Sequence, residues 1–134
     1  MKSKANLFLI GAAKSGTTAL ASSLGQHPAI ASLPIKEPGH FSTDLRIPVF
    51  SSRYNRLLQW DEAAYFKKAR LEERHIGFVE SESNYQKLVD QAITTNPNTN
   101  YVLDASTAYL YSANAPAQLR HYAPDAKIVL ILRN

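Results

Sequence analysis

A loop with the composition of a phosphate-binding site follows the first apolar run of the chain. Residues 7–10 are Leu-Phe-Leu-Ile, and residues 11–18 are Gly-Ala-Ala-Lys-Ser-Gly-Thr-Thr. Gly11 and Gly16 permit a tight turn and a close approach of the backbone to a ligand. A helix beginning at Thr17 directs its free N–H groups and its positive dipole end toward the loop, where an anion is stabilised. The segment therefore predicts a phosphate site, and the plainer alternative is a strand-to-helix turn without a ligand.

The position of the lysine distinguishes this loop from that of the nucleoside triphosphatases. Their motif is G-x-x-x-x-G-K-[ST], with lysine directly after the second glycine. Here Thr17 occupies that position, and Lys14 lies two residues before Gly16. Only the run Tyr101–Asp104 offers a candidate carboxylate for magnesium, so a P-loop kinase or triphosphatase is the weaker alternative and no metal site is predicted. The Lys14 ammonium is expected to face the terminal, transferable end of a phosphate chain.

The elements that position this loop are predicted as strands alternating with helices. Strands are predicted at 6–11, 29–33, 101–104 and 127–132, and helices at 17–24, from Asp61 to Gly77, from Ser83 to Asn96 and at 113–122. Residues 38–59 hold prolines and several serines and are expected to form a loop. The alternation implies parallel pairing through right-handed crossovers. The predicted fold class is α/β, a P-loop-like three-layer fold with a central parallel sheet flanked by helices.

Two of the predicted helices carry capping signals at their start. Asp61 is the expected N-cap of one helix, and Trp60 before it is expected to pack on Tyr65 as a hydrophobic staple. Ser83 and Gln86 form a capping box for the next helix.

Four charged side chains lie at or just after the ends of predicted strands. Lys14 follows the first strand, the second strand carries the chain to Glu37, and Asp104 ends the third. Arg133 follows the strongly apolar run 127–132, which is expected to be a buried strand. Because the carboxyl ends of parallel strands meet at one edge of a sheet, a single site is expected there.

Three segments resemble the sulfotransferases that use 3′-phosphoadenosine-5′-phosphosulfate (PAPS). Lys14–Thr18 after a hydrophobic strand is similar to their 5′-phosphosulfate loop. Residues 35–42 are similar to the Lys-Glu-Pro-His-Phe segment of bacterial and heparan-type sulfotransferases, with Gly39 as a one-residue insertion. Residues 104–112 and 123–134 resemble the second conserved block of that family.

The resemblance implies transfer of a sulfuryl group from PAPS to a hydroxyl or amine of a small-molecule, lipid or carbohydrate acceptor. It places Lys14 at the leaving oxygen and Glu37 as the general base. His40 is the alternative base, because the inserted Gly39 could rotate the segment, and Glu37 would then be an exposed turn carboxylate. Arg133 is expected to bind the 3′-phosphate. The implied cofactor-binding residues are Lys14, Ser15, Gly16, Thr17, Thr18 and Arg133.

Asp104 and Ser106 are assigned to the acceptor side of the site by the same resemblance. The alternatives are that Asp104 caps the turn after its strand and that Ser106 begins the next helix.

Composition adds broad limits. The chain has 134 residues, 45% hydrophobic and 19% charged, which suits one domain over residues 1–134. It has no cysteine, which excludes a disulfide scaffold and a thiolate metal site. The net charge of +4 suits a polyanionic cofactor, but the basic residues are dispersed, so nucleic-acid binding is not expected. No apolar run approaches the ~18 residues of a membrane span.

The length of the chain favours a portion of a sulfotransferase domain. Lys2 and Lys4 before an apolar run mimic a secretion signal, but Lys14 interrupts it, so a core strand and a cytoplasmic location are expected. Sulfotransferases of the resembled kind are longer, and this sequence stops at Asn134, directly after Arg133. We expect an N-terminal, truncated portion of the fold. The alternative from another class is a non-catalytic nucleotide-binding or interaction module.

Overall fold

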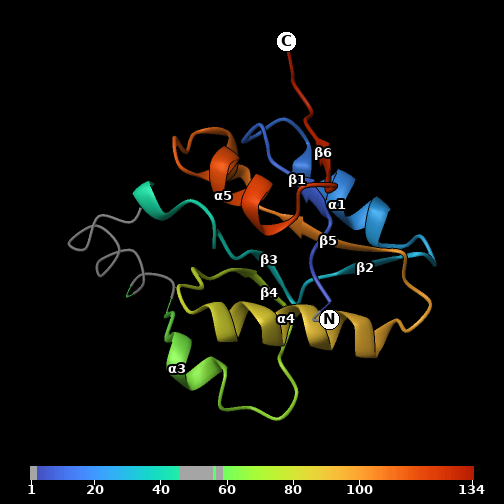
Figure 1. Cartoon of the computed structure of the whole chain (residues 1–134), viewed down its shortest axis with the longest axis vertical. Helices are drawn as coiled ribbons and strands as arrows, with labels where there is room; N and C mark the ends of the chain where they lie inside the picture. Colours follow the sequence, from blue (N-terminus) through green and yellow to red (C-terminus); the bar gives the residue numbers. More distant parts are fainter. Residues whose placement is uncertain (1–2, 46–55, 57–58) are drawn as a thin grey trace.

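The computed structural model describes residues 3–45, 56 and 59–134, and a parallel sheet lies at its centre (Figure 1). Four strands of the described part form this sheet in the order β2-β5-β1-β6. They are β1 (Leu7–Leu9), β2 (Ile30–Ser32), β5 (Tyr101–Ala105) and β6 (Lys127–Val129). Each pairing between them is parallel. The predicted α/β class with a central parallel sheet is confirmed.

Helices cover both faces of the sheet and complete three layers. They are α1 (Thr17–Gly25), α4 (Glu82–Thr95) and α5 (Ala115–Tyr122). Side chains alternate along a strand, so Phe8 and Val102 pack with α4 and α5, whereas Leu9 packs with Ala21 of α1. None of the helices in the described segments has the length and apolar character that a bilayer span requires.

The register of the strands brings three chain connections to one edge. Leu9 of β1 pairs with Ala105 of β5 on one side and with Val129 of β6 on the other. The segments that leave these three strands therefore start at the same carboxyl edge, which is where α/β proteins bind ligands.

A second, two-stranded sheet occupies part of the region where a long helix was expected. The helix α3 covers only Glu62–Tyr65, and β4 (Arg74–Ile76) pairs in parallel with β3 (Ile35–Glu37). The prediction of one helix from Asp61 to Gly77 is therefore wrong in extent. The intervening residues favour a helix, but pairing with β3 outweighs that weak local preference.

The side-chain amide of Gln91 holds the approach to β4. Gln91 Oε1 accepts the Leu71 N–H at 2.6 Å, and Gln91 Nε2 donates to the Leu71 carbonyl at 2.7 Å. One side chain thus satisfies both backbone groups, as a neighbouring strand would.

The two predicted helix caps have different outcomes. Asp61 caps α3 as predicted, with its carboxylate accepting the Ala64 N–H at 3.0 Å. The predicted capping box at Ser83 is wrong, because the N-cap of α4 is Ser81 and the helix already begins at Glu82. The Ser81 hydroxyl accepts the Asn84 N–H at 3.3 Å. Both serines precede the same apolar periodicity, and the local pattern does not decide between them.

The staple before α3 is present, with the Trp60 and Tyr65 rings 5.2 Å apart. The loop predicted over 38–59 contains a 3₁₀ helix, η1 (Thr43–Leu45). Its residues 46–55 and 57–58 lie outside the described part.

β6 is shorter and more exposed than the run 127–132 predicts. The strand ends at Val129 and lies at the edge of the sheet. Ile128 is 51% exposed and Leu132 is 71% exposed. The expectation of a buried strand over this run is therefore wrong in the described structure, where β1 pairs with one side of β6 only.

Candidate functional site

The loop between β1 and α1 has the backbone conformation of an anion-binding turn. Lys14 has φ 58° and Gly16 has φ 88°, so both residues are left-handed. Glycine adopts this region freely, but a lysine there is uncommon, and such residues concentrate at functional sites. Loops that include left-handed residues turn successive N–H groups toward one concave point, where an anion binds. The Lys14 side chain is exposed at this loop.

The N-terminus of α1 faces the loop without a cap from its own side chains. Gly16 is the N-cap residue and provides no side-chain hydrogen bond, and the first turn contains no acidic residue. Thr17 is buried, whereas Thr18 is exposed. The first N–H groups of the helix and its positive dipole end are thus available to an anion.

Segments from two neighbouring strands hold the start of the loop. The Ala12 N–H donates to the Ile131 carbonyl at 2.7 Å, and the Leu110 N–H donates to the Ile10 carbonyl at 3.2 Å. A Cβ atom at Gly11 would lie 2.9 Å from Leu110 Cδ2. Gly11 also has φ 151°, a conformation that other residues rarely adopt, so its backbone together with the nearby Leu110 side chain favours glycine at position 11.

The 3₁₀ helix η2 (Thr107–Leu110) joins Glu37 to this loop. Its last residue, Leu110, contacts Gly11, and at its first residue Thr107 Oγ1 donates to Glu37 Oε1 at 2.9 Å. Glu37 is the last residue of β3, which belongs to the second sheet. Glu37 thus reaches the carboxyl edge of the central sheet through η2, although the strand that carries it belongs to the second sheet and not, as expected, to the central one.

The Glu37 carboxylate has one engaged oxygen. Lys36 Nζ lies 3.4 Å from Glu37 Oε1, the same oxygen that accepts from Thr107, and the two charged side chains are only 16% and 20% exposed. In the described part of the chain, no hydrogen bond or ion pair involves Oε2. This second oxygen is therefore the one without a partner among the described residues.

His40 lies in an aromatic cluster beside Glu37. Its Nδ1 is 2.8 Å from the Val79 carbonyl oxygen, so this nitrogen carries the proton in that contact. The imidazole stacks on the Tyr85 ring at 4.5 Å between centroids and 10° between planes. The ring is therefore held by this hydrogen bond and by its packing on Tyr85. Its role as the alternative base stays a prediction.

Asp104 does not lie at the open edge. β5 extends through Ala105, and the Asp104 side chain is fully buried on the face that packs with α4. Tyr85 and Tyr109 donate to its Oδ2 at 2.7 and 2.8 Å, and Ser106 donates to its Oδ1 at 2.7 Å. Ser106 is also buried, so neither side chain is exposed at the carboxyl edge, and their assignment to the acceptor side stays a prediction.

Burial makes the stability of the protein depend on the ionisation of Asp104. Desolvation by burial, with a smaller contribution from the nearby Glu37 charge, raises its pKa to about 6 against the opposing effect of the three donors. The unfolded value is near 4, so between about pH 4 and 6 the folded chain keeps a proton that the unfolded chain has released. This stabilisation is complete below pH 4 and is lost as the pH rises through 6.

We therefore expect Asp104→Asn to remove this part of the pH dependence. The amide oxygen can still accept from both tyrosines, but it cannot ionise. Between pH 4 and pH 7, the free energy of unfolding measured in urea should fall by about 3 kcal/mol more in the wild type than in the variant. If the free energy of unfolding depends on pH in the same way in both proteins, Asp104 does not titrate in this range.

Arg133 is not brought to the loop by any described contact. It is exposed, and among the described residues no hydrogen bond or ion pair involves its guanidinium. Ile131 still exchanges backbone hydrogen bonds with Gly11 and Ala12, and beyond it the C-terminal end of the chain projects away from the sheet (Figure 1). Its assignment to the 3′-phosphate stays a prediction.

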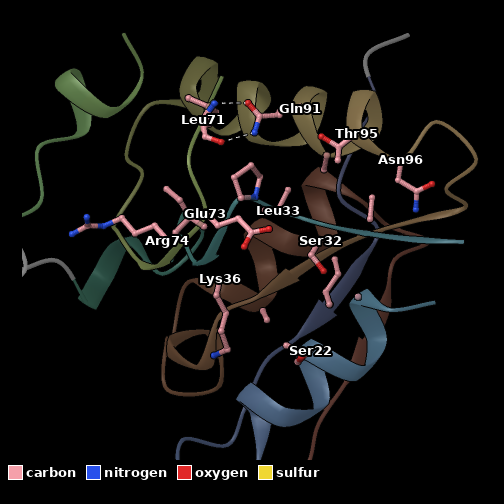
Figure 2. Close-up of a pocket in the computed structure, with 18 of the residues that line it drawn as sticks. Ser22, Ser32, Leu33, Lys36, Leu71, Glu73, Arg74, Gln91, Thr95 and Asn96 are labelled. Carbon is pink, nitrogen blue, oxygen red and sulfur yellow. Dashed lines mark hydrogen bonds between the residues drawn. The ribbon is translucent and has the colours of Figure 1, made fainter. Parts of the chain in front are cut away.

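A cleft with a cavity volume of about 910 Å³ lies beside α1, over β2 and β3, and most of its lining is separate from these residues. Figure 2 shows Gln91 and Leu71 at one side of the cleft, and Lys36 and Ser22 at the other. Thr18 also lines it, but Lys14, Glu37 and His40 do not. The cleft therefore touches the candidate site only at Thr18 and Lys36.

Sequence reasoning missed three hydroxyl groups that order the site, those of Thr107, Tyr85 and Tyr109. The available signal was an aspartate inside an apolar strand, because a buried carboxylate requires donors. In the described segments, no group of three or more metal-ligating side chains is present.

Nearly the whole chain is similar to known proteins. A family model described as the sulfotransferase family matches residues 6–134. Two curated proteins, both named bifunctional heparan sulfate N-deacetylase/N-sulfotransferase 1, are each 30% identical to the chain, one from Caenorhabditis briggsae and one from Caenorhabditis elegans. Each match covers 99% of this chain and 12% of the relative.

A solved structure is also similar. The crystal structure of a sulfotransferase from Alicyclobacillus acidocaldarius matches with a TM-score of 0.69 and 27% identity. The match covers 96% of this chain and 44% of the bacterial chain.

Proposed function

Because the chain belongs to the sulfotransferase family, we propose that it forms the part of a sulfotransferase that binds PAPS and transfers its sulfuryl group to an acceptor. The proposed acceptor is a hydroxyl or amine of a small molecule, a lipid or a carbohydrate. The family supports transferase chemistry in general, and the geometry of the loop supports the donor.

The loop and α1 fit the phosphosulfate end of that donor. The N-terminus of α1 has no side-chain cap and no acidic residue in its first turn, and the left-handed Lys14 and Gly16 flank the turn before it. Ser15, Gly16, Thr17 and Thr18 would hold the 5′-phosphate through backbone N–H groups and hydroxyls. Lys14 would contribute the cation that the loop places outside the usual triphosphatase position.

PAPS supplies an activated sulfuryl group, and the side chains of this chain supply positioning and charge. In the proposed reaction the bond from sulfur to the bridging phosphate oxygen breaks, and a bond from sulfur to the acceptor oxygen or nitrogen forms. Lys14 stabilises the negative charge left on the bridging oxygen. Glu37 accepts the acceptor's proton at Oε2, since Oε1 is engaged by Lys36 and Thr107.

A non-catalytic nucleotide-binding module is the second candidate. The chain spans 12% of the length of the curated relatives and 44% of the solved bacterial sulfotransferase. That these residues catalyse the transfer by themselves is therefore itself a proposal. The exposed Arg133, which makes no described contact with the loop, favours this second candidate.

The uncapped N-terminus of α1 behind the Lys14 loop is the observation that carries the proposal, and nucleotide binding tests it. Isothermal titration is expected to show that 3′-phosphoadenosine 5′-phosphate binds without magnesium and more tightly than ATP. The reason is that the loop lacks the lysine that grips β- and γ-phosphates after the second glycine.

Magnesium-dependent binding of ATP, with no heat from the 3′-phosphorylated nucleotide, would refute the proposed donor. Binding of the 3′-phosphorylated nucleotide without release of sulfate from PAPS to any acceptor would favour the non-catalytic module.

A further inference from the structure

A buried hydrogen-bond network links β5 to the turn that follows Glu37. Its centre is the Asp104 carboxylate, which accepts from the hydroxyls of Tyr85, Tyr109 and Ser106. The exposed fractions of these four side chains are between 0% and 3%. A buried carboxylate with three donors is satisfied, and groups in such a network have little freedom to move.

Ser106 connects this centre to the turn. Its Oγ donates to Asp104 Oδ1 at 2.7 Å and accepts the Gly39 N–H at 3.2 Å. The Ser106 hydroxyl proton therefore points toward the Asp104 carboxylate and away from the turn. Because Asp104 accepts that proton, the Ser106 oxygen lone pairs remain available to the backbone of the turn.

The turn at Gly39 requires both its glycine and this support. Gly39 has φ 57°, and a Cβ atom there would lie 3.0 Å from Phe78 Cδ1. Ser42 closes the turn, with its Oγ donating to the Gly39 carbonyl at 2.8 Å. The one-residue insertion noted in the sequence thus forms a tight, buried turn whose N–H group is bound to Ser106.

Both candidate bases are attached to the same network. On one side, Thr107 follows Ser106 in the chain and donates to Glu37 Oε1. On the other side, the His40 ring stacks on Tyr85, whose hydroxyl donates to Asp104.

We propose that Asp104 and Ser106 are positioning residues that fix the Glu37–His40 turn, rather than residues that contact the acceptor. The inference rests on the proposed function, because it concerns the orientation of the proposed base. The chain of hydrogen bonds from Asp104 through Ser106 to Gly39 determines where the turn lies.

The test is Ser106→Ala, which removes the link and keeps the bulk of the residue close to that of serine. Hydrogen exchange of the Gly39 amide is expected to become about tenfold faster than in the wild type, because the N–H loses its buried acceptor. The stacked Tyr85 ring should shift the proton resonances of the His40 ring upfield in the wild type, and in the variant these resonances are expected to move toward those of the other three histidines. His40→Gln assigns these resonances.

Ser23→Ala, at an exposed position of α1, is the matched control and should change neither readout. Asp104→Asn is the second variant, since it keeps the volume of the side chain, and it is expected to disturb the same two signals. Unchanged Gly39 exchange and unchanged His40 resonances in folded Ser106→Ala would overturn the proposal.

Titration of the same proteins with 3′-phosphoadenosine 5′-phosphate separates this inference from the proposed function. The affinity of Ser106→Ala for this nucleotide is expected to equal that of the wild type, because among the described residues no hydrogen bond joins the network to residues 14–18. Absence of binding in the wild type would count against the proposed donor, while the exchange and resonance data would still decide the positioning role. Lost nucleotide affinity in folded Ser106→Ala alone would contradict the positioning role.

Discussion

Replacement of Lys14 by alanine is expected to lower the rate of sulfuryl transfer by about 10²–10³-fold, the effect of removing one preorganised group that stabilises transition-state charge. The affinity for 3′-phosphoadenosine 5′-phosphate should change far less, because backbone N–H groups of Ser15–Thr18 and the α1 dipole still bind the 5′-phosphate. The ammonium matters most when the bond to the bridging oxygen breaks and charge develops there. Turnover measured as nucleotide release, with affinity from isothermal titration, separates the two effects.

Lys67→Ala is the matched control, because Lys67 is exposed in the segment after α3. This replacement removes the same charge from the protein as Lys14→Ala does. Its turnover should equal that of the wild type. Equal turnover in Lys14→Ala and the wild type would remove Lys14 from the mechanism. Equal losses of turnover and affinity would instead make it a binding residue.

The parts of the fold with local signals were predictable from the sequence. The apolar run 7–10, the glycines and the helix beginning at Thr17 form adjacent elements, and each follows from its own residues. The parallel sheet followed from the alternation of strands and helices, since crossovers allow few other arrangements.

Long-range pairing decided the parts that were wrong. The segment between α3 and Gly77 favours a helix by composition, yet β4 forms because Ile35 and Glu37 of β3 pair with Arg74 and Ile76. Neither strand is identifiable alone, because each has three residues and no alternation long enough to read.

The candidate site shows the same division. The spacing of Lys14 relative to Gly16 was readable in the sequence, whereas the burial of Asp104 was not. An aspartate at the end of an apolar run predicts an open edge, and only the positions of Tyr85 and Tyr109 in space show that it is enclosed. Thr107 gave no signal, because its partner Glu37 is 70 residues away.

The largest effect on turnover is expected from Glu37→Gln. The amide keeps the shape of the side chain and can still accept from Thr107 at its oxygen, but it cannot take a proton from the acceptor. Sulfuryl transfer should be abolished, while the affinity for 3′-phosphoadenosine 5′-phosphate should be kept. His40→Ala should cost little turnover, since the His40 Nδ1 is engaged with the Val79 carbonyl and its ring packs on Tyr85.

Glu82→Gln, in the exposed first turn of α4, controls for the loss of one carboxylate. Nucleotide release from PAPS and titration of the 3′-phosphorylated nucleotide are measured for all three variants. Full turnover in Glu37→Gln together with its loss in folded His40→Ala would transfer the role of base to the imidazole. The geometry favours Glu37, because its Oε1 is fixed by Lys36 and Thr107 and its Oε2 has no partner among the described residues. A base needs both an oxygen held in place and an oxygen left open, and Glu37 meets both conditions.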